Sequence, residues 1–121
     1  MNRNRKELGY YGEAVARKAL EKQGYRLREK NFTIRGGEID LIMEKGNELV
    51  FVEVKTRRSQ SYGSPLESVT PQKQKRFLHA AEVYLSAVGL TDPDVRFFAV
   101  GVEMGEGDRV KKVEILKDIF C

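Results

Sequence analysis

The sequence of 121 residues lacks the features that mark secreted and membrane proteins. Its one cysteine, Cys121, is the last residue, so it has no internal disulfide partner and no cysteine at metal-ligand spacing. No apolar run approaches the roughly 20 residues that a membrane-spanning helix needs. The basic N-terminus, MNRNRK, is not followed by the apolar segment of a signal peptide. We therefore expect a cytoplasmic protein without a membrane anchor.

Histidine is equally scarce, since His79 is the only one. It falls one step outside the apolar face of the helix expected over residues 71–88, which favours a surface position over a metal ligand. No internal repeat or low-complexity segment is visible. The length corresponds to one domain, spanning residues 1–121, and 40% hydrophobic residues are enough for a core.

The hydrophobic periodicity predicts two helices and five strands in the order αβββαββ. The helices are expected over residues 7–23, ending before Gly24, and over residues 71–88, where Thr70 is the N-cap and Pro71 the first helical residue. The strands are expected over residues 25–34, over two segments within 37–55, and over 95–102 and 110–116. Residues 56–70 are polar and are expected to form a loop. Because a helix connects the third and fourth strands, these two should be parallel. The fold class is therefore α/β, with a mixed central sheet flanked by helices.

Charged residues interrupt the two apolar strands of segment 37–55, which reads GEIDLIMEKGNELVFVEVK. Gly46 is the first residue of a two-residue turn and suits a type II′ hairpin. That register places Asp40 directly opposite Glu53, with their Cβ atoms roughly 4.5–5.5 Å apart. Burying a carboxylate costs free energy unless it is compensated, and one divalent cation compensates two carboxylates. The hairpin therefore predicts a cation site between Asp40 and Glu53.

The alternation of side chains along a strand adds Lys55 to the same face. Lys55 follows Glu53 by two residues, and the register sets it opposite Glu38. The residues expected on the opposite face from Asp40 are Ile39, Leu41 and Met43. The alternative is an ordinary solvated hairpin face, on which Glu38 and Lys55 form a cross-strand ion pair. The joint placement of Asp40, Glu53 and Lys55 favours a functional site.

Glu13 lies at the edge of the buried stripe of the first helix. Two positions for its carboxylate remain open. It either reaches the face that carries Asp40 and Glu53, or it forms an ion pair with Arg17 one turn later.

Basic residues gather on both sides of the polar segment that follows the hairpin. Between residues 55 and 76 there are six basic residues and one acid, a local charge of +5 that exceeds the +4 of the whole chain. The start of a helix that also carries lysine and arginine is a natural phosphate site. This pattern suggests a polyanion held beside the carboxylates, although a solvated helix face and a loop would have the same composition.

Three segments together resemble a known group of proteins. Glu13, Asp40 and Glu53-Val54-Lys55 are similar to the site of the PD-(D/E)xK nuclease superfamily, whose restriction-endonuclease-like core has the order αβββαβ. A closer resemblance, covering residues 9–85, is to the YraN-like family of uncharacterised bacterial proteins. It is carried by residues 12–14 (GEA), 36–42 (GGEIDLI) and 51–55 (FVEVK). The layout is also similar to that of archaeal Holliday-junction resolvases.

The resemblance implies metal-dependent hydrolysis of phosphodiester bonds, with DNA favoured over RNA as the substrate. No set of residues indicates base-specific readout, so structure-selective or weakly sequence-selective binding is expected. Asp40, Glu53 and the Val54 carbonyl would bind Mg²⁺ or Mn²⁺, and Glu13 would hold a second ion directly or through water. Lys55 would orient the attacking water or help to deprotonate it, and would stabilise the negative charge that develops on the phosphate. The residues that would hold flanking phosphates are Arg57, Arg58, Gln72, Lys73, Lys75 and Arg76. A homodimer is a further expectation, because many proteins of this fold cut two strands.

Two other functions remain open at this stage, because fold does not establish activity. One is a nucleic-acid-binding module that has the nuclease-like fold but no activity on its own. The other is a structural or interaction protein built on a nuclease scaffold.

Overall fold

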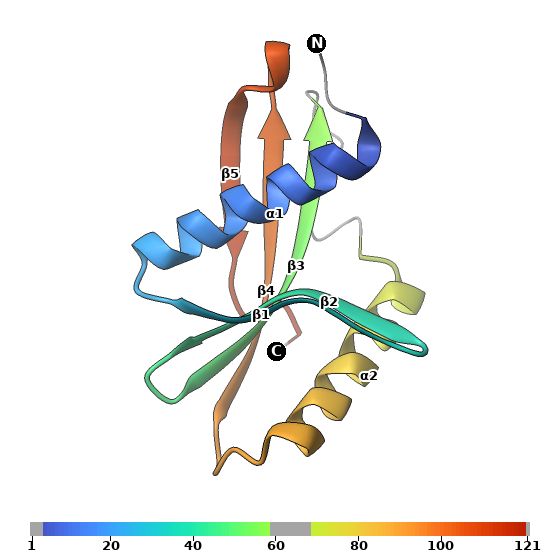
Figure 1. Ribbon diagram of the computed structural model, residues 1–121, viewed down its shortest axis with the longest axis vertical. Helices are drawn as coiled ribbons and strands as arrows, with labels where there is room; N and C mark the ends of the chain where they lie inside the picture. The colour runs from blue at the N-terminus through green and yellow to red at the C-terminus, as the bar shows by residue number, and fades with distance from the viewer. Residues whose placement is uncertain (1–3, 59–68, 121) are drawn as a thin grey trace.

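The computed structural model describes residues 4–58 and 69–120 (Figure 1). The elements are α1 (Arg5–Lys22), β1 (Arg26–Ile34), β2 (Gly37–Lys45), β3 (Glu48–Arg58), α2 (Pro71–Val88), β4 (Asp94–Met104), the short 3₁₀ helix η2 (Glu106–Asp108) and β5 (Val110–Leu116). The predicted order αβββαββ is therefore confirmed. The expected loop over residues 56–70 is partly wrong, since residues 56–58 belong to β3. Residues 59–68 of that loop lie outside the described residues.

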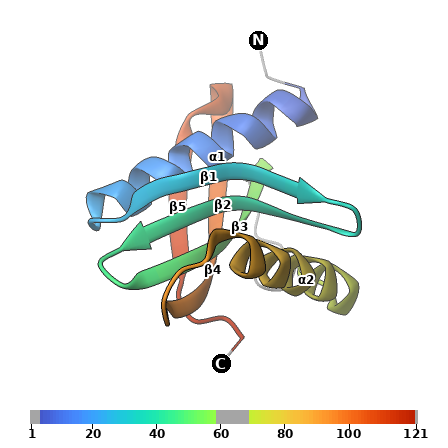
Figure 2. The ribbon, with the colours of Figure 1, turned by 60° about the horizontal axis from the view of Figure 1, so that its bottom comes forward.

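The five strands form one mixed sheet in the order β1-β2-β3-β4-β5. Neighbouring strands are antiparallel except β3 and β4, which are parallel because α2 connects them, as predicted. Figure 2 shows α1 and α2 on opposite faces of the sheet. The α/β fold class is confirmed, and the architecture is consistent with the restriction-endonuclease-like core expected from the sequence.

Both helices begin at residues whose side chains cap them. Asn4 accepts a hydrogen bond from the Glu7 amide at 2.9 Å, so α1 begins two residues before the predicted start. Thr70 accepts one from the Lys73 amide at 3.2 Å, and α2 has its predicted bounds. In the described ranges no helix has the length and apolar character needed to cross a membrane.

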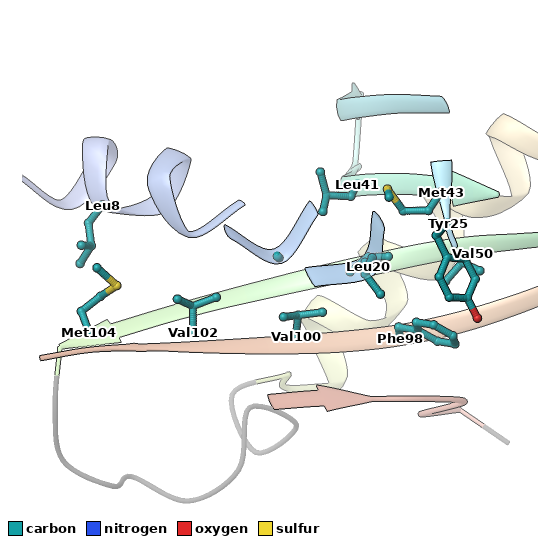
Figure 3. Packing of buried hydrophobic residues seen from close by; sticks show 12 residues of the cluster. Leu8, Leu20, Tyr25, Leu41, Met43, Val50, Phe98, Val100, Val102 and Met104 are labelled. Carbon is teal, nitrogen blue, oxygen red and sulfur yellow. The ribbon is translucent and has the colours of Figure 1, made fainter. Parts of the chain in front are cut away.

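Each face of the sheet carries a hydrophobic core. The core under α1 joins Leu8 and Leu20 of the helix to a row of β4 residues that includes Val100 (Figure 3). The core under α2 contains Phe77, Phe51 and other residues of β2 and β3. In β3, Val50 and Val52 belong to the α1 core, whereas Leu49 and Phe51 belong to the α2 core, as the alternation predicts.

Ile39 departs from the predicted alternation. It was expected beside Leu41 and Met43, but it packs in the α2 core with Ile42, while Leu41 and Met43 lie in the α1 core. The physical reason is that β2 pairs with β3 only over residues 41–45. Residues 37–40 are not held in that ladder, so the alternation of faces is not continuous through Asp40. Asp40 is the last residue of β2 before this ladder begins.

Candidate active site

The β2–β3 hairpin has the predicted register but a shorter ladder. Its residues pair from Lys45 with Glu48 up to Leu41 with Val52, around a turn in which Gly46 has a φ of +58°. Backbone pairing therefore ends one residue short of Asp40 and Glu53. At this point Oδ2 of Asp40 accepts a hydrogen bond from the amide nitrogen of Val54 at 2.7 Å. A carboxylate thus replaces the main-chain acceptor where the strands separate.

The carboxyl groups of Asp40 and Glu53 lie in hydrogen-bonding contact in this gap. Burial raises the pKa of Glu53 to about 9, and the charge of Asp40 contributes in the same direction. Burial also raises the pKa of Asp40, although the hydrogen bond from the Val54 amide opposes the change. Near neutral pH the pair therefore shares a proton, which protonated Glu53 donates to Asp40. The structure thus brings together the two acids that the register places opposite each other.

Lys55 lies close to both acids, since its charge acts on the pKa of Asp40 and that of Glu53 acts on Lys55. Burial and the neighbouring ammonium group of Lys73 lower the pKa of Lys55. The alternative ion pair with Glu38 is not formed among the described residues. Glu38 instead lies opposite Thr33 of β1. Two adjacent ammonium groups beside the acids favour an anion at this end of the site.

Glu13 approaches the same acids from α1. Its side chain contacts that of Asn31, and burial, followed by the charge of Asp40, raises the pKa of Glu13 to about 7. Arg17 does not pair with Glu13, because its Nε contacts Oε2 of Glu21 at 3.0 Å. Of the two positions left open by the sequence, Glu13 thus takes the one near Asp40.

Asn31 was missed by the sequence analysis, although a signal for it existed. Asparagine is depleted in strands, and Asn31 lies inside β1 with a left-handed φ of +53°. This conformation accompanies its contact with Glu13.

Two glycines allow the helices to lie close to the strands that carry the acids. A Cβ on Gly12 of α1 would overlap Oγ1 of Thr56, the residue after Lys55 in β3. A Cβ on Gly37 of β2 would overlap the main-chain carbonyl oxygen of Arg76 in α2. The site therefore lies between two unusually close contacts of helix and strand.

The predicted phosphate-binding residues lie at different distances from the acids. Lys73 interacts with both Lys55 and Glu53, and Arg57 acts on Lys55. Arg58 forms an ion pair with Asp108, with Nε and Oδ1 3.0 Å apart. The others, Gln72, Lys75 and Arg76, are exposed on the first turns of α2. Their binding of nucleic acid remains a prediction.

The residues around Asp40 could hold a divalent ion that takes few of its ligands from the protein. In the ranges 4–58 and 69–120 no group of three or more histidine, cysteine, aspartate or glutamate side chains is placed to hold a metal ion. The available donors are the carboxylates of Asp40 and Glu53 and the carbonyl of Val54, which lies on the same strand edge as the Val54 amide. Mg²⁺ prefers such oxygen ligands and is commonly held by one or two carboxylates with several waters.

Comparison with known proteins connects this geometry to a family. Residues 12–102 match the model described as "Uncharacterised protein family UPF0102". The chain belongs to the UPF0102 family. This is the YraN-like family expected from the sequence, a member of the restriction-endonuclease-like superfamily. The matched range contains all of Glu13, Asp40, Glu53 and Lys55.

Similar UPF0102 proteins align with nearly the whole chain. The one from Alkaliphilus metalliredigens is 46% identical over 115 residues, which are 95% of this chain and 98% of the relative. The one from Moorella thermoacetica is 41% identical over 120 residues, or 99% and 100% of the two chains. The one from Caldicellulosiruptor saccharolyticus is 38% identical over 117 residues, or 97% and 99%.

Proposed function

We propose that this UPF0102 protein is a metal-dependent nuclease that hydrolyses phosphodiester bonds in DNA. One observation carries the proposal: Asp40 and Glu53 contact each other at the end of the β2–β3 ladder, with Lys55 beside them. Two buried acids in contact are unfavourable for the fold, because burial raises the pKa of both and the charge of Asp40 raises the pKa of Glu53 further. Groups perturbed in this way concentrate at functional sites.

In this proposal Asp40 and Glu53 bind Mg²⁺ or Mn²⁺, with the Val54 carbonyl as a further oxygen ligand. The ion supplies Lewis-acid polarisation of the phosphate and makes hydroxide accessible near neutral pH. Asp40 and Glu53 would hold the ion as carboxylates, the form in which oxygen ligands bind a divalent cation. The Val54 amide fixes Asp40 for this role through its hydrogen bond of 2.7 Å.

The remaining side chains act on water and on the phosphate. The ammonium of Lys55 orients the attacking water and stabilises the negative charge that develops on the phosphate, and Lys73 adds a second positive charge. Glu13, with a pKa of about 7, is suited to accept the proton that the water loses. Hydrolysis forms one bond from the water oxygen to phosphorus and breaks the bond to the leaving sugar oxygen, which takes a proton from solvent.

A cleavage panel tests the proposal. Wild type, Glu53→Ala and Lys55→Ala are compared on duplex, single-stranded, flap and junction DNA and on RNA, each with Mg²⁺, Mn²⁺ or EDTA. We expect metal-dependent cleavage of DNA by the wild type and a loss of about 100-fold or more in each variant. Glu29→Gln, which changes an exposed acid of β1, is the matched control. Equal residual activity in all proteins would indicate a contaminating nuclease and contradict the proposal.

Calorimetry with Mn²⁺ tests the metal separately from the chemistry. The wild type should bind Mn²⁺, and Asp40→Ala should not. Absence of binding to the wild type at millimolar metal would exclude Asp40 and Glu53 as the ligands.

A nucleic-acid-binding module without activity of its own is the second candidate. The observation that favours it is the absence, among the described residues, of three clustered metal-ligating side chains. It would be selected by salt-dependent binding of DNA without cleavage on any member of the panel.

A further inference from the structure

A groove leads away from the candidate active site on the α1 side of the sheet. It has a volume of about 600 Å³ and lies between α1 and strands β1 and β2. Its lining includes Tyr10, Asn31, the lysines Lys18 and Lys30, the acid Glu13, and Arg17, which is paired with the acid Glu21 of the same groove. Leu41, which follows Asp40 in the chain, forms part of its wall. Glu13 links the groove to the site, because it lines the groove and the charge of Asp40 acts on its pKa.

The groove combines an exposed aromatic ring with basic side chains. Tyr10 is 54% exposed, a large fraction for an aromatic side chain, and it precedes Glu13 by three residues, so both lie on one side of α1. Lys18 of α1 and Lys30 of β1 are exposed on the two sides of the groove. Figure 2 shows α1 beside β1, the two elements that carry these lysines.

We infer that this groove binds an unpaired strand of DNA, so that the substrate class is DNA with a single-stranded segment joined to the scissile bond. Proteins that bind single strands combine a positively charged groove with aromatic side chains on which bases stack. Tyr10 stacks on a base, and Lys18 and Lys30 neutralise the neighbouring phosphates. This inference deepens the proposed function and rests on it.

The size of the groove and the chemistry of Tyr10 favour a single strand over a duplex. A volume of about 600 Å³ lies in the range that holds one small organic molecule, which corresponds to about one or two nucleotides. In a duplex the faces of the bases are covered by their neighbours, so a tyrosine ring stacks on a base only where the base is unpaired. In this proposal the strand passes Glu13, the lining residue on which the charge of Asp40 acts, on its way to the site.

The experiment measures binding without cleavage, by fluorescence anisotropy in EDTA. The probes are an end-labelled single strand, a duplex of the same sequence and the duplex with a single-stranded flap. Tyr10→Ala should raise Kd for the single strand and the flap by about 5- to 150-fold and leave the duplex unchanged. Tyr10→Phe keeps the ring and should bind within about twofold of wild type. Lys6→Gln, an exposed substitution in α1 outside the groove, is the control.

Salt dependence separates the role of Lys30 from that of Tyr10. If Lys30 contacts a phosphate, Lys30→Gln should reduce the slope of log K against log salt by about 0.7 for the single strand. Tyr10→Ala should weaken binding without changing that slope. Thermal melting of each variant controls for the fold, which exposed substitutions should preserve.

The outcomes distinguish the groove from the nuclease proposal. Unchanged binding of the single strand by Tyr10→Ala, together with metal-dependent cleavage by the wild type, would overturn the groove and leave the nuclease standing. Tyr10-dependent binding of the single strand without any cleavage would support the groove and overturn the nuclease. A wild type that binds none of the probes in EDTA would overturn the groove, and failure to cleave any substrate of the panel with Mg²⁺ or Mn²⁺ would overturn the nuclease as well.

Discussion

Replacing Gly12 by alanine should destabilise the protein, although this change stabilises most helices. Alanine is favoured over glycine inside a helix by about 0.8–1.0 kcal/mol. At Gly12, however, the new Cβ would overlap Oγ1 of Thr56 and lie 2.9 Å from its Cβ. Gly9, one turn earlier in α1, has no atom within 4 Å of the corresponding position. Gly9→Ala is therefore a matched control, with the same gain in helix propensity and no overlap with another atom.

The expected magnitude follows from the difference between the two variants. Inserting a methyl group into a filled contact costs about 1–3 kcal/mol. Both variants gain the same helix propensity, so Gly12→Ala should be less stable than Gly9→Ala by the cost of the overlap alone. For a chain of this length the difference corresponds to about 3–15 °C in Tm. Gly9→Ala itself should be more stable than wild type by up to about 1 kcal/mol.

Thermal and urea unfolding, followed by circular dichroism, measure these differences. A double-mutant cycle with Thr56→Ala then tests the cause, because that change removes Oγ1 and Cγ2 but leaves the Cβ of residue 56. The double variant should recover part of the stability lost in Gly12→Ala. Equal stability of Gly12→Ala and Gly9→Ala, or no coupling with Thr56→Ala, would refute the close contact between α1 and β3.

Two further predictions concern buried acids. Glu53→Gln should raise Tm in EDTA, and its advantage should grow by several degrees from about pH 5 to about pH 9. In the folded protein the pKa of Glu53 is about 9, above its value in the unfolded chain, so the wild type is most stable at low pH and loses stability as the pH rises toward 9. Parallel pH profiles of Tm for the variant and the wild type would contradict this prediction. Asp108→Asn should lower stability by about 1–3 kcal/mol, because the Asp108 side chain is only 2% exposed and accepts hydrogen bonds from Arg58 at 3.0 and 3.3 Å. Asparagine tolerates the φ of +55° at this position, so a Tm equal to that of the exposed control Glu106→Gln would show that the ion pair contributes nothing.

The helices and the hairpin register could be predicted because their signals are local. Thr70 and Pro71 mark the start of α2 through capping and fixed backbone geometry, and the structure has the helix at those residues. Gly46 sets a two-residue turn, from which the pairing of all residues in the ladder follows. A slip by one residue would exchange the faces of Val52 and Phe51, so the apolar pattern of β3 supports the same register.

The end of the ladder could not be predicted, because it depends on tertiary packing. Nothing local to Asp40 indicates that backbone pairing stops at Leu41, or that Ile39 turns toward the α2 core. The position of Glu13 depends on how α1 lies on the sheet, and the spacing of residues in the sequence does not determine that placement. The ion pair between Arg58 and Asp108 joins residues 50 positions apart, so it could not be predicted from local sequence either.

The separation of β2 from β3 at Asp40 lies between two close contacts of helix and strand. On one face α1 contacts β3 at Thr56 through Gly12, and on the other α2 contacts β2 at Gly37 through the Arg76 carbonyl. Gly37 is three residues before Asp40 and Thr56 is three residues after Glu53, so the two contacts lie on either side of the place where the pairing of β2 and β3 ends. There the Val54 amide donates its hydrogen bond to the Asp40 carboxylate and not to a main-chain carbonyl of β2. The two acids and Lys55 therefore meet between strands that helices hold closely from opposite faces.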